Sequence, residues 1–496
     1  MTGFTNPVIP GFHPDPSVCR VGDDYYLVTS TFTWAPGVPI FHSRNLVDWT
    51  QIANVLDRPS QLDLTATTGW ASLGVYAPTI RHHDGVYYVA TTNFTHGGAP
   101  TFFVTAEDPA GPWSDPVRVD VGGVDPDLAW DDEGRCWLHF SRSVDIARVE
   151  IDHRTGAVLD GPHATWTGTG LQYPEAPHLI RRGGWWYLLI AEGGTHAGHA
   201  VSVARGPSPE GPWEGCPDNP VLSHRSTAHP IQNTGHADLV EAPDGSWWMV
   251  LLGVRPKGGF HVLGRETFLA PVEWVDDWPV VGPLDLEMPR RPPGTETTAT
   301  TDTASTHDDF DGLALDPRWV GVRRAPAALA SLTARPGWLT LPGRTATLDD
   351  DFPVFVGRRQ QHRHCRVRAR LDPGSTAEAG LAVVMAHEAH IEIGVRGDEI
   401  VAHVRTTTIS VEVGRAAAPT GPVTLVIETR PSILGPDLVA LGFEAPDGTP
   451  TVVAEVDGRY CSTEVVLGFT GRVIGMYAVG GDAAFDWFAY EPLEHP

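Results

Sequence analysis

The feature that most constrains this chain is a pattern that occurs five times in its first 290 or so residues. Each copy has a polar or aromatic leading residue, a short apolar stretch, a turn, and an aromatic run. The leading residues are Asp15, Tyr76, Asp125, Glu175 and His236. Their spacings of 61, 49, 50 and 61 residues are close to the length of a β-propeller blade. Five copies predict a five-bladed β-propeller.

Each copy also contains the signals of an antiparallel hairpin. Turns such as Asp84-Gly85, Asp244-Gly245 and Gly183-Gly184 join two short runs rich in β-branched and aromatic residues. Because propeller blades surround a central channel, the five leading residues should converge near its axis. Like charges held together raise each other's pKa, so three carboxylates at one pole indicate chemistry rather than stability.

The second part of the chain has a different pattern. Residues 289–307 include a Thr-rich tract that cannot bury apolar area. After it, short alternating runs such as Cys365–Leu371, Val423–Glu428 and Phe485–Tyr490 predict a β-sandwich. We therefore expect an all-β protein with a propeller at 1–293, a linker at 294–307 and a concanavalin-like β-sandwich at 308–496.

Composition narrows the possible partners and location. The formal net charge of −26 argues against nucleic acid and anionic membrane surfaces, and a neutral substrate fits better. Neither a secretory signal nor an apolar run of membrane-spanning length is visible, so we expect a soluble, cytoplasmic protein. The five scattered cysteines indicate reduced, buried thiols without a functional role.

Two of the leading carboxylates suit glycoside hydrolysis. Inverting glycosidases place an acid and a base roughly 6.5 to 9.5 Å apart, with a water between them. Asp15 and Glu175 lie on non-adjacent blades and are the natural pair. Taken alone, Asp15 and Asp125 could be Asp-Pro turn residues, and Glu175 could face solvent. Their shared register across the repeats favours the catalytic interpretation.

Other residues near the predicted axis could bind a sugar. Phe32, Trp34, Trp70 and Tyr76 could stack on a sugar ring, although each could equally be part of blade packing.

Two further polar residues belong to the same predicted site. Arg265 could donate a fork of hydrogen bonds to hydroxyls or a carboxylate, or it could form a salt bridge with Glu266 or with another blade residue. His236 could be an ordinary core histidine, orient a carboxylate or hold a hydrated cation. One histidine is not a metal site by itself.

Several longer pieces resemble glycoside hydrolase family 43, in particular its β-xylosidase-like members with a C-terminal β-sandwich. The matching pieces in the propeller are 6–17 (NPVIPGFHPDPS), 36–49 (PGVPIFHSRNLVDW), 175–179 (EAPHL), 191–195 (AEGGT), 235–240 (GHADLV) and 263–269 (LGRETFL). Pieces at 308–311 (DDFD), 469–472 (FTGR) and 485–488 (FDWF) extend the likeness to the second domain.

The resemblance implies a role for each site residue. Asp15 would be the general base, Glu175 the general acid, and Asp125 the carboxylate that orients and tunes this acid. Arg265 would contact substrate, and His236 would lie under the site, where some relatives hold calcium. No cofactor would be required, with Ca²⁺ near His236 as a possibility.

The chain departs from its relatives in two places. Tyr76 stands where relatives commonly have Trp. Residues 469–476 resemble the region that in relatives sends a loop to the pocket, but the piece 478–481 (AVGG) is short. This leaves open whether an aromatic residue of the second domain reaches the site.

These observations lead to one functional expectation with alternatives. We expect an exo-acting, inverting hydrolase that releases xylose from xylo-oligosaccharides, with α-L-arabinofuranosidase activity as the alternative. A non-catalytic sugar-binding or protein-interaction propeller is the alternative of another class. A β-fructosidase would be expected to have Arg-Asp-Pro around Asp125, but Val124 precedes that residue. The sequence leaves the oligomeric state open, with a homo-oligomer as one possibility.

Overall fold

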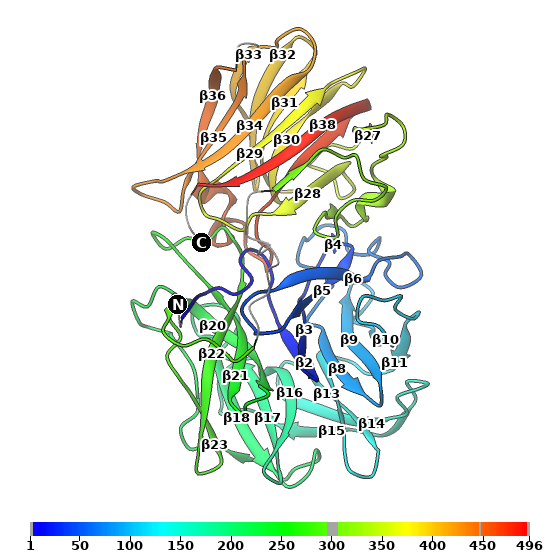
Figure 1. The fold of residues 1–496 in the computed structure, drawn as a ribbon, viewed down its shortest axis with the longest axis vertical. Helices are drawn as coiled ribbons and strands as arrows, with labels where there is room; N and C mark the ends of the chain where they lie inside the picture. The colour runs from blue at the N-terminus through cyan, green and yellow to red at the C-terminus, as the bar shows by residue number, and fades with distance from the viewer. Residues whose placement is uncertain (1–2, 295–305, 446–447, 494–496) are drawn as a thin grey trace.

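The computed structural model describes residues 3–294, 306–445 and 448–493. Figure 1 shows two bodies stacked along the long axis, a propeller below and a sandwich above. Within the described residues the helical elements are η1 (Pro326–Ala328), η2 (Gly458–Cys461) and α1 (Thr463–Val466). None of the helices in these residues has the length and apolar character needed to cross a membrane.

Five antiparallel sheets, each from one stretch of chain, form the blades. Blade one contains β2 (Ser17–Val21), β3 (Asp24–Val28), β5 (Gly37–Ser43) and β6 (Thr50–Leu56). Blade two contains β7 (Gly74–Val75), β8 (Thr79–His83), β9 (Val86–Phe94), β10 (Thr101–Ala106) and β11 (Val117–Val119). Blade three contains β12 (Val124–Trp130), β13 (Cys136–Ser141), β14 (Ile146–Ile151) and β15 (Val158–Trp166). Blade four contains β16 (Glu175–Arg182), β17 (Trp185–Glu192), β18 (Ala200–Gly206) and β19 (Glu214–Gly215). Blade five contains β20 (Gln232–Glu241), β21 (Trp247–Val254), β22 (Glu266–Val275) and β23 (Trp278–Val281).

The innermost strands of the five blades close into a ring. β2, β8, β12, β16 and β20 contact one another in this order, and β20 returns to β2. Strand β1 (Phe4–Thr5) pairs with β24 (Glu287–Met288), and the Asn6 side chain exchanges two hydrogen bonds with the Leu269 backbone. The N-terminal segment is therefore fixed to the last blade, and the predicted five-bladed propeller is confirmed.

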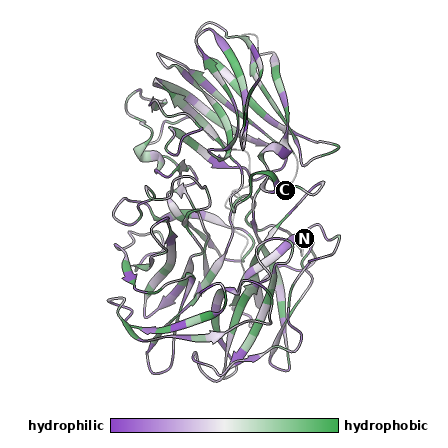
Figure 2. Ribbon diagram, turned by 180° about the vertical axis from the view of Figure 1, so that it is seen from behind, coloured by the Kyte–Doolittle hydropathy of each residue, from purple (hydrophilic) through white to green (hydrophobic). Residues whose placement is uncertain are grey.

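The second domain is a sandwich of two antiparallel sheets. One sheet contains β25 (Thr306–Asp308), β27 (Leu339–Gly343), β29 (Cys365–Asp372), β34 (Val423–Arg430), β35 (Leu438–Glu444), β36 (Pro450–Asp457) and β38 (Gly481–Pro492). The other contains β28 (Phe355–Arg359), β30 (Glu378–Ala386), β31 (Ala389–Arg396), β32 (Glu399–Thr406), β33 (Ile409–Ala417) and β37 (Val473–Val479). Apolar and polar residues alternate along these strands, as Figure 2 shows, because one face of each sheet packs into the shared core.

The predicted linker falls largely on residues outside the described part. Residues 295–305 of the predicted 294–307 segment lie there. Thr306 and His307 already form part of β25, which pairs with β38. These two residues therefore belong to the sandwich sheet rather than to a linker.

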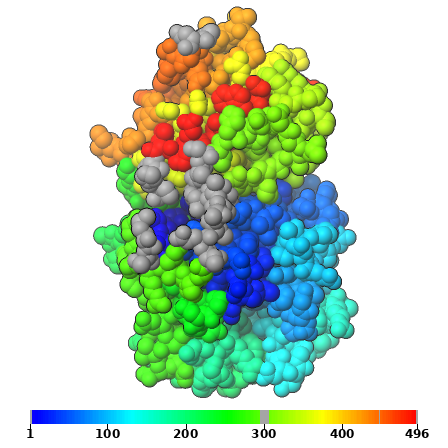
Figure 3. Space-filling model, in the orientation of Figure 1, coloured from blue at the N-terminus to red at the C-terminus, as the bar shows by residue number. Residues whose placement is uncertain are grey.

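The two domains share an apolar interface. Strand β26 (Gly321–Val322) pairs with β4 (Trp34–Ala35) of the propeller. In Figure 3 the yellow-green residues at the start of the sandwich lie against the blue first blade. Phe12, Phe32 and Trp34 pack there with residues of the sandwich, including Phe355 and Tyr477.

A charged cluster fills the propeller axis below the leading residues. The Arg81 guanidinium lies 2.9 Å from a carboxylate oxygen of Asp127 and 2.9 Å from one of Asp238. It also lies 3.2 Å from His178 Nδ1, and Ser17 donates to Asp238. These residues come from five different inner strands, so Arg81 links all the blades at the centre.

We predict that replacing Arg81 with Met destabilises the protein. The substitution leaves two fully buried carboxylates without a cation, which costs about 3 to 5 kcal/mol for comparable buried pairs. Urea unfolding measures this free energy. Arg181→Met, which breaks the exposed pair with Asp132, is the control and should cost less than about 1 kcal/mol. Equal losses for both variants would contradict the central role of Arg81.

Candidate active site

The leading residues sit at irregularities where the inner strands begin. Asp15, Asp125 and His236 have φ of 57°, 57° and 48°, values that are uncommon for residues other than glycine. The strand register also shifts after Val124 in β12 and after Glu175 in β16. Such bulges re-aim side chains, and here they turn the leading residues toward the axis at one end of the propeller.

Asp15 is a buried carboxylate held by several donors. Arg265 Nη1 lies 2.9 Å from its Oδ1, Ser30 donates to its Oδ2 at 2.5 Å, and His236 Nδ1 lies 3.4 Å from its Oδ1. Burial acts to raise the pKa of Asp15, but the Arg265 charge, His236, Ser30 and His199 together lower it. Asp15 is therefore ionised at neutral pH.

Asp125 and Glu175 form the second half of the acidic cluster. Asp125 is buried and accepts a hydrogen bond from the Ala176 backbone at 3.2 Å. Burial, followed by the charges of Glu175 and Asp15, raises the pKa of Asp125 well above its usual value. The Glu175 side chain is 26% exposed and its Oε1 lies 3.5 Å from His199 Nε2. Glu175 is thus the member of this pair that an incoming ligand can reach.

His236 lies between Asp15 and His178 of the Arg81 cluster. Burial lowers its pKa to about 4, so the imidazole is neutral at physiological pH. Its ring lies 6.0 Å from that of His178, which belongs to the Arg81 cluster. His236 is therefore placed to orient Asp15.

The residues around His236 do not fit a directly bound divalent cation. Within the described residues no group of three or more His, Cys, Asp or Glu has the arrangement of a metal site. The nearby carboxylates Asp127 and Asp238 are already paired with Arg81. A second cation beside this guanidinium would be repelled, so the calcium predicted near His236 enters no step below.

Aromatic side chains form a wall beside the acidic cluster. The Phe32 ring packs against Tyr76 at 5.3 Å, and Tyr76 stacks on Phe94 at 5.0 Å. Trp70 is 41% exposed and stands at the rim. Trp34 lies elsewhere: it is buried and packs against Phe355 in the domain interface. The structure thus brings three of the four predicted aromatics together.

The sandwich domain contributes an aromatic ring to this wall, a point that the sequence left open. Phe469 lies 5.6 Å from Phe32 and 5.7 Å from Trp70, and the Arg265 guanidinium lies 5.3 Å from its ring. Its backbone N–H donates to Ser72 Oγ of the propeller at 2.8 Å. An aromatic of the second domain therefore reaches the site.

A buried ion pair holds the loop that carries Phe469. Arg472 pairs with Asp437 and donates to the backbone oxygens of Gly458 and Cys461. All these groups are buried, so both ends of the loop are fixed to the sandwich core. The sequence contained one signal of this role, because Phe469 opens the FTGR piece.

Sequence reasoning missed three other residues of the site. His199 contacts Glu175, Thr195 accepts from Arg265 at 3.1 Å, and Ser30 holds Asp15. They do not occupy the leading positions of the repeat, so aligning the five copies could not identify them. A side chain at Gly235 would come within 2.2 Å of the His199 ring, which explains why glycine precedes His236.

Arg265 is the remaining predicted site residue, and it forms a salt bridge within the propeller. It pairs with a residue of another blade, Asp15, rather than with Glu266. Glu266 instead binds Arg255, at 2.8 and 2.9 Å. Arg265 also lines a small hollow together with Thr195, Asn233 and Phe469.

Comparison with known proteins places this geometry in a family. Residues 4–279 match the model for "Glycosyl hydrolases family 43", and residues 307–491 match "Beta xylosidase C-terminal Concanavalin A-like domain". The chain is 39% identical to the non-reducing end alpha-L-arabinofuranosidase of Bacteroides ovatus, over 99% of this chain and 95% of that protein. It is 38% identical to the xylosidase/arabinosidase of Butyrivibrio fibrisolvens, over 95% of both.

Solved structures agree over both domains. The GH43B protein of the Bacteroides ovatus xyloglucan locus gives a TM-score of 0.91 at 38% identity, covering 99% of this chain and 100% of that one. The xylan beta-1,4-xylosidase of Bacillus halodurans gives 0.90 at 33% identity, covering 98% and 100%. Together with the acidic cluster, these matches show that the chain belongs to glycosyl hydrolase family 43 and is an inverting, exo-acting glycosidase.

Proposed function

We propose that this enzyme releases single xylose units from the ends of short xylan-derived oligosaccharides. The observation that carries the proposal is the meeting of Asp15, Asp125 and Glu175 beside Arg265. The family gives the reaction class, and two relatives named for xylosidase activity support the sugar. We also propose that no cofactor is required, because Asp15 and Glu175 can provide both proton transfers.

Asp15 is proposed as the general base. A base that activates water must be ionised, and the lowered pKa of Asp15 meets this requirement. Arg265, Ser30 and His236 fix both carboxylate oxygens, so the direction from which Asp15 takes a proton is set in advance. Water attacks the anomeric carbon from the face opposite the leaving group, which inverts its configuration.

Glu175 is proposed as the general acid, tuned by Asp125. The raised pKa of Asp125 supports a proton held in this corner of the site, which protonation of a leaving oxygen needs. Asp125 is buried and Glu175 is accessible, so Glu175 delivers the proton and Asp125 modulates it. His199 Nε2 lies 3.5 Å from Glu175 Oε1, so it is placed to orient the acid when the side chain of Glu175 moves closer on substrate binding.

The sugar would lie between Arg265 and the aromatic wall. Arg265, which pairs with Asp15, can donate to sugar hydroxyls, while Phe32, Tyr76 and Phe469 cover apolar ring faces. Trp70 at the rim would contact the next sugar unit. We assign Trp34 to domain packing.

The second candidate is α-L-arabinofuranosidase activity. The Bacteroides ovatus relative, whose name states this activity, is 39% identical over almost the whole chain. The catalytic carboxylates cannot distinguish the two sugars, since they act only at the anomeric centre. Nitrophenyl β-xyloside and nitrophenyl α-L-arabinofuranoside, assayed in parallel, give the ratio of the two kcat/KM values. We propose that xylose gives the larger value. Cytoplasmic location and a homo-oligomer remain predictions from the sequence.

Removal of either catalytic carboxylate should abolish most activity. We predict that Asp15→Asn and Glu175→Gln each lower kcat on xylobiose by about 10² to 10⁴-fold, the usual contribution of a general acid or base. Glu175→Gln should retain far more activity on a dinitrophenyl xyloside, whose leaving group departs without protonation. Asp132→Asn, at an exposed ion pair with Arg181, is the control. Near-normal hydrolysis by the Asp15 variant would refute its role.

The loss of activity at low pH should follow the protonation of Asp15. Activity requires ionised Asp15, so kcat/KM falls as pH drops through the pKa of this group. Arg265 lowers this pKa, and Arg265→Met removes that effect, so the limb should move to higher pH. The comparison uses kcat/KM from about pH 3 to 8, with Arg205→Met on the blade surface as control. If the acid side of the kcat/KM profile does not move in Arg265→Met, even when the rate itself falls, Arg265 does not lower the pKa of Asp15.

Removal of the Phe469 ring should weaken substrate binding. We predict that Phe469→Ala lowers kcat/KM by about 10-fold or more, as expected for losing one buried aromatic contact. The exposed Leu467 lies on the same loop, so Leu467→Ala is the matched control and should leave kcat/KM unchanged. If Phe469→Ala behaves like the control, the sandwich contributes no contact to the sugar.

A further inference from the structure

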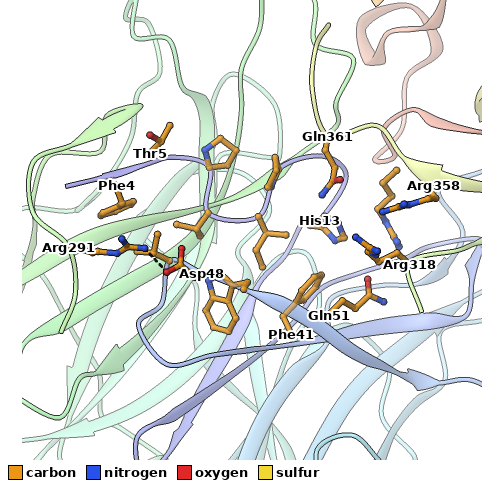
Figure 4. A pocket seen from close by; sticks show the side chains of 17 residues that line it. Phe4, Thr5, His13, Phe41, Asp48, Gln51, Arg291, Arg318, Arg358 and Gln361 are labelled. Carbon is orange, nitrogen blue, oxygen red and sulfur yellow. Dashed lines mark hydrogen bonds and ion pairs between the residues drawn. The ribbon is translucent and has the colours of Figure 1, made fainter. Parts of the chain in front are cut away.

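A second cavity lies between the two domains, on the far side of the segment that carries Asp15. Its volume is about 310 Å³. The N-terminal segment, the first blade and strand β28 of the sandwich line it. Figure 4 shows Arg318 and Arg358 on one side, Arg291 with Asp48 on the other, and His13 between them. Four arginines line this cavity, although the chain has a net charge of −26.

Two of the four arginines have carboxylate partners close by. Arg291 pairs with Asp48 at 2.6 Å, and Arg318 pairs with Asp316 at 2.8 Å. Arg358 donates to Thr306 Oγ1 at 2.6 Å. These contacts account for part of the charge, but none of them involves the fourth arginine.

Arg359 is buried, and none of the residues that the structure describes provides it with a counter-ion. Arg359 is only 6% exposed. Its Nε and Nη2 atoms have no hydrogen-bond partner among the described residues. Burial lowers its pKa to about 10, which reflects the cost of a charge without a compensating carboxylate. The Phe12 ring, 5.6 Å away, provides a weak cation–π contact instead.

His13 presents a second unused polar group to the same cavity. It is buried, its Nδ1 has no hydrogen-bond partner among the described residues, and its ring packs edge-on against Phe41 at 5.1 Å. Burial and the Arg359 charge lower the pKa of His13, so the two side chains are electrostatically coupled. A buried guanidinium beside a buried imidazole is a costly arrangement unless an acceptor joins them.

We propose that this cavity binds a small anion whose carboxylate or phosphate group is held by Arg359 and His13. A guanidinium offers two parallel N–H donors that match either group. Apolar side chains such as Ile9, Phe41 and Trp49 line the remainder of the cavity and can cover the ring of an attached sugar. A uronic acid and a sugar phosphate share this chemistry.

The proposed site is separate from the catalytic one but shares its backbone. Phe12 packs on Phe32 of the aromatic wall at 6.0 Å, and the His13 N–H donates to the Arg265 carbonyl. The segment from Phe12 to Asp15 therefore forms the partition between the two sites. The anion would reach neither Asp15 nor the inner side of Arg265.

The test measures anion binding by the full-length protein. Inorganic phosphate, glucuronate and uncharged glucose are each titrated by calorimetry and by thermal unfolding, against sodium chloride at equal ionic strength. Phosphate raises the Tm of many proteins by exclusion from their surface. The decisive quantity is thus the difference between the wild type and Arg359→Met.

We expect phosphate or glucuronate, but not glucose, to bind the wild type, and Arg359→Met to weaken binding by about tenfold or more. The stronger of the two anions identifies the preferred group. Arg359→Met should unfold at or above the wild-type Tm without anion, since it removes an uncompensated buried charge. Arg335→Met, which breaks an exposed pair with Asp372 in the same domain, should bind like the wild type.

His13→Asn provides a second variant should Arg359→Met fail to fold, and it too should weaken anion binding. Equal responses of the wild type and the folded variant would overturn the proposal, as would the absence of binding by both anions. Either result would show that Arg359 is a structural residue of the interface.

Discussion

The structure depends on the neutralisation of carboxylates along the propeller axis. Two levels of buried charge occur there, each organised by one arginine: Arg265 with Asp15, and Arg81 with Asp127 and Asp238. The upper level has three carboxylates for one guanidinium. Burial, followed by the charges of Glu175 and Asp15, raises the pKa of Asp125. The proposed acid and base therefore belong to one cluster that has more carboxylates than cations.

The sandwich completes this site rather than merely accompanying it. Phe469 covers Arg265, and its loop is fixed by the fully buried Arg472–Asp437 pair. The sandwich core sets the position of Phe469. This ring therefore lies at the site in the propeller only if the two domains keep a constant orientation. The paired strands β4 and β26 and the shared apolar cluster around Phe355 provide that constraint. The domains thus function as one unit.

The sequence predicted the fold and the acidic cluster because both follow from a repeat. Equal register placed Asp15, Asp125, Glu175 and His236 at one end of the axis, where the structure has them. Contacts between repeats or domains carry no such signal. His199 and Phe469 therefore escaped the argument from register. Trp34 was grouped with the sugar-binding aromatics because a strand pattern cannot tell a surface facing the axis from one facing the second domain.

The same reasoning indicates where sugar specificity must arise. An apolar wall built by Phe32, Tyr76 and Phe469 distinguishes two pentoses poorly, because a shape difference in a hydrophobic pocket changes rates only about 10 to 200-fold. Hydrogen-bonding groups discriminate more strongly, since a wrong sugar leaves them unpaired. Arg265 and Thr195 are joined by a 3.1 Å hydrogen bond, and Arg265 also pairs with Asp15, so their donors are placed to discriminate between hydroxyl patterns. We therefore expect the choice between xylose and arabinose to depend on these polar groups rather than on the aromatic wall or the carboxylates.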